Sequence, residues 1–523
     1  MAESKPGTTI HRKPNGAAYL YSFESYWDKG KKAARNRQVC LGRYNEETGE
    51  LIPSKRRKEK TESEGAGAGA GFKATTKVYG PYLLLSRLAE ETGLAGMLET
   101  CMPDISDEIL SLVFFIVQKG VALSRCNLWS ASHQHPYGQP IGSQQVSDLL
   151  RKITEDSRQH FLSLWMGRLL ENEFLCYDIT SVSSYATANE YVRLGYNRDK
   201  EKLPQINLAM LYGQKSGLPA YYRRLQGAIT DVATLDTTID TLDFLGKKKL
   251  HLVLDRGFYS EDNLDTLFEK RYRFILMART DRVWVREIID QYYEQVSSPE
   301  HYRQISEDEV LYMVAHLFKW KGHRCYAHLY YNATKAAEDF DKLNKKLVIC
   351  KGELEANEPV GEHKSLYERF FIIKRTPKRG LSVSYNNEEI QKYRKRYAGF
   401  FCILTNVKTD SGELLEIYRR KDVVENCFDD LKNGLDMKRL RIHSSPAMDA
   451  RLFIQFLALI LTSKIRSEVR DDKALKYMSP REIMEAMESI VRITCVDKPW
   501  SIYSETSPIQ QKIVDLFDIA TET

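Results

Sequence analysis

The segment from residue 173 to residue 279 constrains the fold of this chain most, because its apolar pattern changes period in a definite order. It opens with three strand-like runs in succession, and short connections make such strands antiparallel. A helix-like run, a buried strand, a second helix-like run and a last strand follow. The pattern therefore predicts an α/β domain. Its strand-like runs are residues 173–185, 206–213, 218–227, 250–255 and 272–279.

Three antiparallel strands followed by alternating helix and strand form the order of a ribonuclease H-like core with a mixed five-stranded sheet. Residues 171–279 hold the first part of this core, which still lacks its last helix. The Tyr-rich residues 280–415 carry strand-like runs of their own, so they predict an inserted β-rich subdomain rather than a loop. Residues 416–470 then return to the core, with the missing helix and an apolar helix that packs behind the sheet.

The parts of the chain outside this core predict four further units. Residues 1–60 have strand-like runs separated by basic turns, which indicates a β-rich basic module. Residues 61–78 include the run GAGAGAG and predict a linker. Residues 79–170 carry apolar residues at three- and four-residue spacing, so they predict a helical domain, either DNA-binding or purely packing. Residues 471–523 are expected to be helical.

Composition bears on the partner and the compartment of the protein. The net charge is only +6, but basic residues gather in runs, and several such runs favour a polyanionic partner. Nine cysteines without a CxxC pair argue against a zinc ribbon or a disulfide framework and favour a reducing compartment. The apolar stretch 452–461 is too short to span a bilayer and no signal peptide opens the chain, so we expect a cytoplasmic protein without membrane contact.

Three acidic residues stand at chemically suggestive positions. Asp178 lies inside an otherwise apolar strand, where a charge is costly unless it is paired or holds a metal. Asp255 ends a strand, a place where α/β proteins commonly present catalytic groups. Glu425 lies on a helix predicted over Tyr418–Lys432. Singly, each has an ordinary alternative, namely a turn cap for Asp178, an ion pair with Arg256 for Asp255 and a solvated helix face for Glu425.

These three positions belong to the first strand, the fourth strand and the closing helix, which converge at one end of a ribonuclease H-like sheet. A site made of carboxylates alone suits Mg²⁺ or Mn²⁺ and not zinc. Two such ions would clamp a scissile phosphate, one activating a water or a 3′-hydroxyl and the other stabilising the leaving oxygen. The predicted chemistry is phosphodiester hydrolysis and strand transfer on DNA.

The motifs YDITS, VLDRGFYS and YRRKDVVENCFDDLK together resemble those of DDE transposases of bacterial insertion sequences, over roughly residues 170 to 465. The resemblance is to the branch whose catalytic helix carries Tyr-x2-Arg-x3-Glu-x6-Lys and whose ribonuclease H-like core is interrupted by a β-rich insertion. Here the signature reads Tyr418, Lys421, Glu425 and Lys432. Lysine at the arginine position keeps the charge but loses the bidentate fork.

The resemblance implies a cut-and-paste transposase, a Mg²⁺-dependent endonuclease that cleaves double-stranded DNA at inverted-repeat ends and joins the ends to target DNA. It implies a homodimer in the synaptic complex and a nucleoid-associated place in the cytoplasm of a bacterium or archaeon. It also implies that two metal ions are held by the DDE motif, Asp178, Asp255 and Glu425. Two alternatives stay open: a related nuclease without strand transfer, and a catalytically silent DNA-binding regulator, which would predict a damaged triad.

The expected DNA contacts come from several parts of the chain. The resemblance implies that Tyr418, Lys421 and Lys432 hold DNA near the cut. It also makes Trp320 the candidate for stacking on a flipped base in a terminal hairpin, although a packed core tryptophan is the commoner role. Further contacts are expected from Arg256 beside Asp255 and from a basic N-terminal turn, for which a soluble β cap is the alternative. The residues of that turn are Lys31, Lys32 and Arg35.

Overall fold

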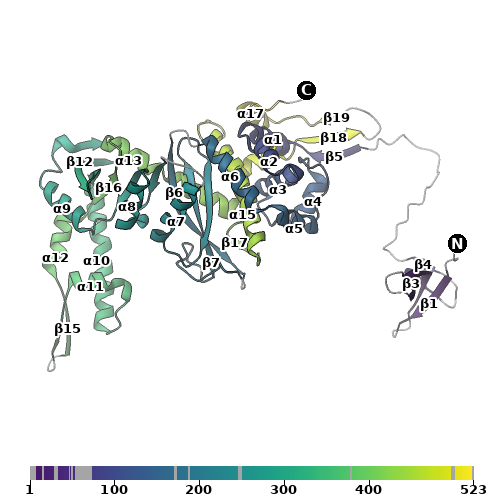
Figure 1. The fold of residues 1–523 in the computed structure, drawn as a ribbon, viewed down its shortest axis with the longest axis horizontal. Helices are drawn as coiled ribbons and strands as arrows, with labels where there is room; N and C mark the ends of the chain where they lie inside the picture. The colour runs from purple at the N-terminus through teal and green to yellow at the C-terminus, as the bar shows by residue number, and fades with distance from the viewer. Residues whose placement is uncertain are drawn as a thin grey trace. The chain divides into compact units, whose positions relative to one another are not determined.

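The computed structural model describes most of the chain and divides it into two compact units, Met1–Phe72 and Lys73–Thr523 (Figure 1). We describe each unit by itself. The described residues are 7–13, 17–28, 33–45, 48, 51–53, 74–169, 173–186, 189–244, 250–376, 380–495 and 501–520.

The smaller unit is a four-stranded sheet with the strand order β1-β2-β3-β4, in which all neighbours are antiparallel. Aromatic residues recur along its second strand, as is typical of a half-buried sheet. Of the basic turn that was expected to contact DNA, Lys31 and Lys32 lie outside the described residues. Arg35 pairs with Tyr26 in the backbone register, but its side chain is outside the described part. The strands are β1 (Gly7–Arg12), β2 (Ala18–Asp28), β3 (Ala33–Tyr44) and β4 (Leu51–Pro53).

The larger unit is built on a mixed sheet of ten strands, in the order β11-β12-β13-β16-β10-β9-β6-β7-β8, with β17 (Arg439–Leu440) also paired to β6. Its five core strands are those predicted from the sequence. The first three pair antiparallel, whereas the first, fourth and fifth run parallel, which is the ribonuclease H-like order. These strands are β6 (Phe174–Ser184), β7 (Gln205–Gly213), β8 (Pro219–Gln226), β9 (His251–Leu254) and β10 (Arg273–Ala278).

Helices connect and cover the core strands. Helix α7 (Asp231–Phe244) joins β8 to β9, and α8 (Glu261–Glu269) joins β9 to β10. Helix α8 begins at Ser260, whose side chain accepts a hydrogen bond from the Asn263 N–H, an N-cap that satisfies one of the free donors of the first turn. Every residue of β7 is buried, as expected for a strand covered on both faces.

The sheet has more strands than the five predicted, because four strands of the insertion continue the same sheet. Strand β16 pairs antiparallel with both β10 and β13, so it covers the edge that β10 would otherwise leave open. The sequence pattern predicts β12, β13 and β16 as strands but not the three-residue β11, and it does not show which edge each strand pairs with. The inserted strands are β11 (Tyr302–Gln304), β12 (Val310–Trp320), β13 (His323–Tyr331) and β16 (Phe400–Thr405).

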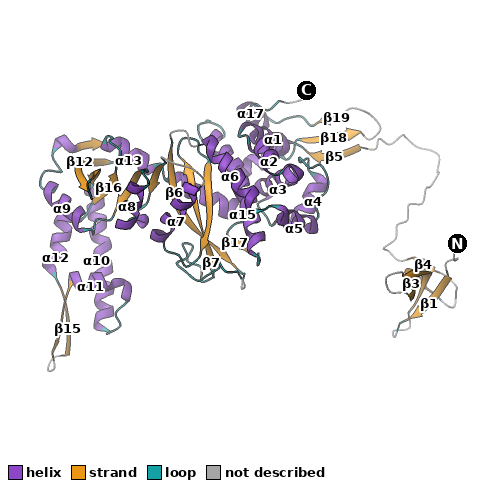
Figure 2. Cartoon of the chain, in the orientation of Figure 1, coloured by secondary structure: helices purple, strands orange, loops and turns teal. Residues whose placement is uncertain are grey.

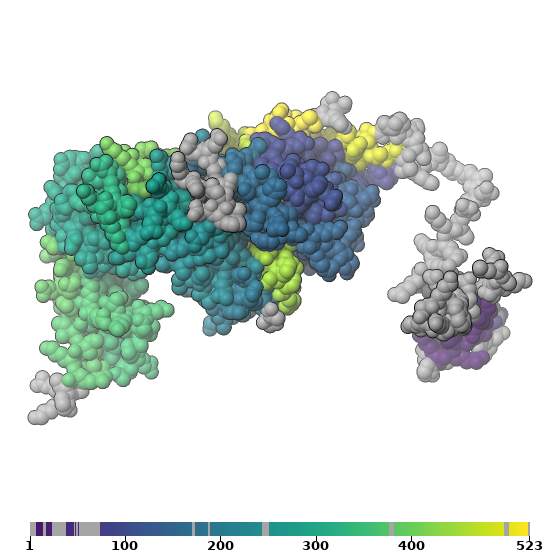
Figure 3. Space-filling view, in the orientation of Figure 1, coloured from purple at the N-terminus to yellow at the C-terminus, as the bar shows by residue number. Residues whose placement is uncertain are grey.

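The rest of the insertion forms a lobe with a small core of its own. In Figures 1 and 3 this lobe is the green part that extends away from the teal strands. Its buried residues are Leu343, Leu347, Cys350, Leu354, Tyr367, Phe370, Phe371 and Ile390. Its elements are α10 (Ala333–Glu355), α11 (Lys364–Phe370), β14 (Phe371–Thr376), β15 (Gly380–Tyr385) and α12 (Asn387–Lys392). Helix α9 (Val283–Tyr292), which precedes β11, buries its apolar residues in the main core.

A helical domain packs against the other side of the core. In Figure 2 it is the group of helices labelled α1 to α6. Helix α15 (Ser445–Val469) is buried along most of its length and contacts both β8 and α3, so it joins the helical domain to the sheet. Gly120 ends α3 in the left-handed region at φ 54°, and a Cβ there would collide with the carbonyl oxygen of Gly434. The preceding helices are α1 (Gly80–Glu91), α2 (Leu94–Cys101), α3 (Ser106–Lys119), α4 (Cys126–Ser132), α5 (Ser143–Lys152) and α6 (Glu155–Leu169).

The last part of the chain differs from the expectation of helices alone. Helices α16 (Pro480–Met487) and α17 (Pro508–Leu516) are present, but β18 (Val491–Cys495) and β19 (Ser501–Tyr503) lie between them. Strand β18 pairs with β5 (Ala74–Val78), in the stretch that was expected to be linker. These strands are too short for a clear period. Strand β18 pairs with a segment more than four hundred residues away in the chain, and β19 pairs with β18.

No single helix in the described ranges is long and apolar enough to cross a membrane. The two segments Pro103–Lys119 and Leu123–Ser132 meet that criterion only together, with a 95° bend between them.

Candidate active site

The sheet places Asp178 and Asp255 side by side. Tyr177 on β6 pairs with Leu254 on β9, and these two strands are parallel neighbours. Each aspartate is the next residue after this pair, so the two side chains leave the sheet from adjacent positions on the same face. Their proximity at the carboxyl end of β9 is therefore a property of the strand register.

Asp255 is held from two directions. Its Oδ1 accepts hydrogen bonds from the Arg256 N–H and from the Tyr418 hydroxyl, both at 2.8 Å. Tyr418 lies on α13 (Ser411–Arg419) and is buried. Burial and the negative charge of Asp255 hold the pKa of Tyr418 well above its usual range, so this hydroxyl remains a donor. The contact ties the helix after the insertion to the end of β9.

Asp178 carries a strongly perturbed carboxyl group. Its Oδ1 accepts a hydrogen bond from the Ile179 N–H at 2.8 Å. Burial raises the pKa of Asp178 to about 6, and the nearby charge of Asp255 adds to this, whereas the Ile179 N–H, Arg198 and Lys421 act in the opposite direction. The charged form of Asp178 is thus disfavoured here, which is the situation that a bound cation would relieve.

Glu425 lies on α14 (Asp422–Asp429) and points towards solvent, with 63% of its side chain exposed. The Lys421 Nζ lies 3.6 Å from its Oε1 and also 5.8 Å from the centre of the Tyr418 ring. Lys421 therefore stands between Glu425 and the two aspartates. The three carboxylates do not all come within 4.8 Å of one another; among the described residues that criterion is met by Cys350, Glu353 and His363, in the insertion lobe.

The prediction of one continuous helix over Tyr418–Lys432 was wrong. Helix α13 ends at Arg419, α14 begins at Asp422, and a π-helical turn follows at Asp430–Gly434. The Lys421 N–H bonds to the Tyr418 carbonyl, a tight three-residue turn that redirects the chain. As a result Tyr418 turns inward while Glu425 stays on the surface.

Lys432 and Trp320, which were expected to contact DNA, have protein partners here. The Lys432 Nζ lies 2.7 Å from the Asp199 carboxylate, and only 11% of its side chain is exposed. Trp320 at the end of β12 is partly buried against the core, and its Nε1 donates to Asp265 Oδ1 at 2.9 Å. These contacts are those of a partly packed tryptophan, and the stacking role of Trp320 stays a prediction. Arg256, in contrast, is exposed beside Asp255.

Sequence reasoning missed two residues of the site. Arg198 pairs with Asp231 at 2.6 Å and lowers the pKa of Asp178, and Asp199 holds Lys432. Both lie in a polar loop between β6 and β7, where no periodic pattern marks a residue as important. The clue available was the clustering of charges in NRDKEK, residues 197–202, in the loop that precedes β7.

Comparison with known proteins places this geometry in a family. Residues 170–461 match the family model described as transposase DDE domain, which is more than half of the chain. No curated protein matches the chain. Among solved structures, a chain of the piggyBac transposase synaptic complex with hairpin DNA is similar at 12% identity and a TM-score of 0.38, covering 80% of this chain and 82% of that one. On the family match, the chain belongs to the transposase DDE domain family.

Proposed function

We propose that this protein is a cut-and-paste DNA transposase that cleaves the inverted-repeat ends of an insertion sequence and joins them to target DNA, acting as a homodimer. The observation that carries the proposal is the pair of adjacent aspartates on β6 and β9, one of them with a pKa raised to about 6 by burial. Glu425 completes the acidic triad, and the Tyr418, Lys421, Glu425, Lys432 signature supports the branch with the inserted core.

The donor set fits hard divalent cations. Among the described residues, Asp178 and Asp255 each accept hydrogen bonds through Oδ1 only. Within the described ranges their Oδ2 atoms have no hydrogen-bond partner, and neither is fully buried. Both Oδ2 atoms are therefore accessible to a further ligand, and carboxylate oxygens are the ligands that Mg²⁺ and Mn²⁺ prefer. Two such ions, when bound, would supply an activated oxygen nucleophile and stabilisation of the leaving oxygen.

Two neighbouring side chains, Tyr418 and Lys421, orient the carboxylates and offset their charge. Tyr418 orients Asp255 through a hydrogen bond from a buried hydroxyl. Lys421 balances part of the negative charge, and its ammonium is free to attract a DNA phosphate when Glu425 turns inward. The Lys421–Glu425 pair is half solvated and therefore costs little to break.

Cleavage of labelled inverted-repeat ends in Mg²⁺ tests the proposal. Asp178→Asn, Asp255→Asn and Glu425→Gln should each abolish cleavage while end binding in EDTA stays nearly intact, because an amide keeps the shape but is a poorer ligand for a hard cation. Glu416→Gln is the matched control, because Glu416 is equally exposed and also pairs with a cation four residues away, Arg420.

Near-normal cutting by any of the three variants would remove that residue from the triad. Pre-cut ends with a plasmid target separate the two alternatives. A nuclease without strand transfer cleaves but does not join, and a silent regulator binds ends without cutting them.

A further inference from the structure

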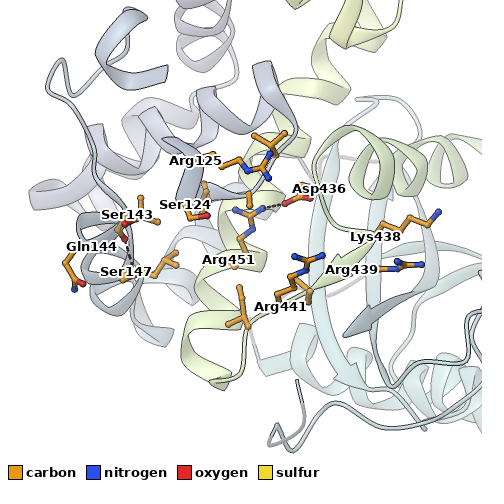
Figure 4. A pocket seen from close by; sticks show the side chains of 17 residues that line it. Ser124, Arg125, Ser143, Gln144, Ser147, Asp436, Lys438, Arg439, Arg441 and Arg451 are labelled. Atoms are coloured by element: carbon orange, nitrogen blue, oxygen red, sulfur yellow. Dashed lines mark hydrogen bonds and ion pairs between the residues drawn. The ribbon is translucent and has the colours of Figure 1, made fainter. Parts of the chain in front are cut away.

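A groove of about 980 Å³ in the larger unit lies between the helical domain and the segment that follows the catalytic helices. One wall is formed by residues 121–125 and the start of α5. The other is formed by residues 436–442, which include β17 (Arg439–Leu440), and by Arg451 on α15. Figure 4 shows side chains from both walls approaching the same space.

The groove is strongly positive. Five cations line it against a single acid, Asp436. Arg451 pairs with Asp436 at 3.2 Å, and Arg439 pairs with Glu201 at 2.7 Å. The five cations are Arg125, Lys438, Arg439, Arg441 and Arg451.

Three of these cations have no carboxylate partner at ion-pair distance among the described residues. Arg125, Lys438 and Arg441 are exposed, and within the described ranges none of them forms an ion pair with a carboxylate. Arg125 and Arg441 both act on the charge of Asp436, so they lie close to it from opposite walls. Excess positive charge in a concave surface attracts an extended anion and not a single carboxylate.

The polar side of the groove also suits an anion. Ser143, Gln144 and Ser147 line it, and they belong to the first turns of α5. The backbone N–H groups at the start of a ten-residue helix give this wall a partial positive charge. Hydroxyl and amide side chains of this kind commonly contact phosphate oxygens of DNA.

The groove shares a lining residue with the hollow that contains Glu425. Lys438 lines both this groove and a second hollow of about 450 Å³ that contains Glu425. Strand β17 pairs in parallel with Ser183 and Ser184 at the end of β6, the strand that holds Asp178. A DNA strand that presents a phosphate to the carboxylates can therefore continue past Lys438 into the groove.

We propose that this groove binds the phosphate backbone of the duplex that flanks the scissile phosphate at the element's end. The inference rests on the proposed function. If Glu425 is part of the cleavage site, the DNA that reaches the groove past Lys438 is the duplex that flanks the cut. The recognition is electrostatic and independent of base sequence, with Arg125, Lys438 and Arg441 each neutralising one phosphate.

Binding of the full-length protein to labelled end DNA, measured in EDTA over a range of salt, tests this without any cleavage step. If three phosphate contacts are lost, the slope of log K against log salt should become shallower by about 2.7, since each contact contributes about 0.9. The affinity advantage at 50 mM over 200 mM salt should then fall by about 40-fold in the triple variant Arg125→Ala, Lys438→Ala, Arg441→Ala.

Two controls keep the result interpretable. The charge-preserving variant Arg125→Lys, Lys438→Arg, Arg441→Lys should retain the wild-type slope, which shows that the charge and not the shape of these side chains sets it. A second triple alanine variant at exposed lysines outside the groove should also leave the slope unchanged. These lysines are Lys473, Lys476 and Lys512.

An unchanged salt slope for end DNA in the groove variant would overturn the proposal. So would intact end binding combined with loss of strand transfer into a plasmid, because the occupant would then be target DNA. Failure of the proposed function is seen separately: it would appear as normal cleavage by Asp178→Asn, while the salt slope of the groove variant does not depend on catalysis.

Discussion

Asp178→Asn is expected to stabilise the metal-free protein, and increasingly so as pH rises. The pKa of Asp178 is raised from 3.8 to about 6 in the folded state, so the unfolded chain releases this proton first and stability falls as pH rises between these two values. The difference of about 2 pH units corresponds to roughly 3 kcal/mol above pH 7, at about 1.4 kcal/mol per unit. At pH 4.5 the same relation gives a destabilisation of the folded state by Asp178 of only about 1 kcal/mol.

Thermal unfolding of wild type and variant in EDTA, followed from pH 4.5 to pH 8, measures this effect. A chain of this size does not unfold in one two-state step, so the quantity to compare is the difference in Tm between the two proteins at each pH. We expect that difference to be a few °C at pH 8 and smaller at pH 4.5. Asp471→Asn, at a largely exposed carboxylate, is the control and should show no such trend.

Adding Mg²⁺ should raise the Tm of the wild type more than that of Asp178→Asn, because a ligand stabilises the state that binds it. A Tm difference that is the same at both pH values, or a variant that is less stable throughout, would refute the reasoning. The surroundings of Asp178 would then stabilise its charged form without a bound cation.

Two further predictions concern the side chains around the carboxylates. Tyr418→Phe removes the hydroxyl that donates to Asp255. A hydrogen bond to a charged group contributes about 1.5–3 kcal/mol, so single-turnover cleavage should slow by about 10- to 150-fold while end binding is unchanged. A wild-type rate would show that Asp255 is positioned without this hydrogen bond. Lys421→Arg should preserve or improve cleavage, because it restores the bidentate fork, whereas Lys421→Ala should lose a similar factor. Wild-type single-turnover rates for Lys421→Ala would make this lysine a solvated surface charge.

Local pattern in the sequence was enough to identify the strands and the two aspartates. Period-two and buried runs depend only on neighbouring residues, so β6 to β10 could be read in order, and that order limits the sheet to few arrangements. Asp178 within an apolar strand and Asp255 at a strand end are also local features. Their adjacency follows from the predicted order once the strands pair in parallel.

The helical segment Tyr418–Lys432 shows where local pattern is insufficient. Three- and four-residue spacing predicts that Tyr418, Lys421, Glu425 and Lys432 share one face, but the chain breaks between α13 and α14. The hydrogen bond from Tyr418 to Asp255 and the ion pair between Lys432 and Asp199 join segments that lie 163 and 233 residues apart. Such contacts outweigh helix continuity, and spacing within one segment contains no information about them.

The same distinction separates the basic runs of the sequence from the basic groove of the fold. The run Lys438–Arg441 is visible in the sequence, but as a short charged stretch it is indistinguishable from a solvated surface. Packing of the helical domain against the chain that follows α14, with Gly120 against Gly434, sets Arg125 opposite Arg441. The sequence by itself determined the core strands β6 to β10 and which residues are charged. Only the tertiary structure decided where the helix after the insertion breaks and which charges face one another, because both depend on contacts between segments remote in the chain.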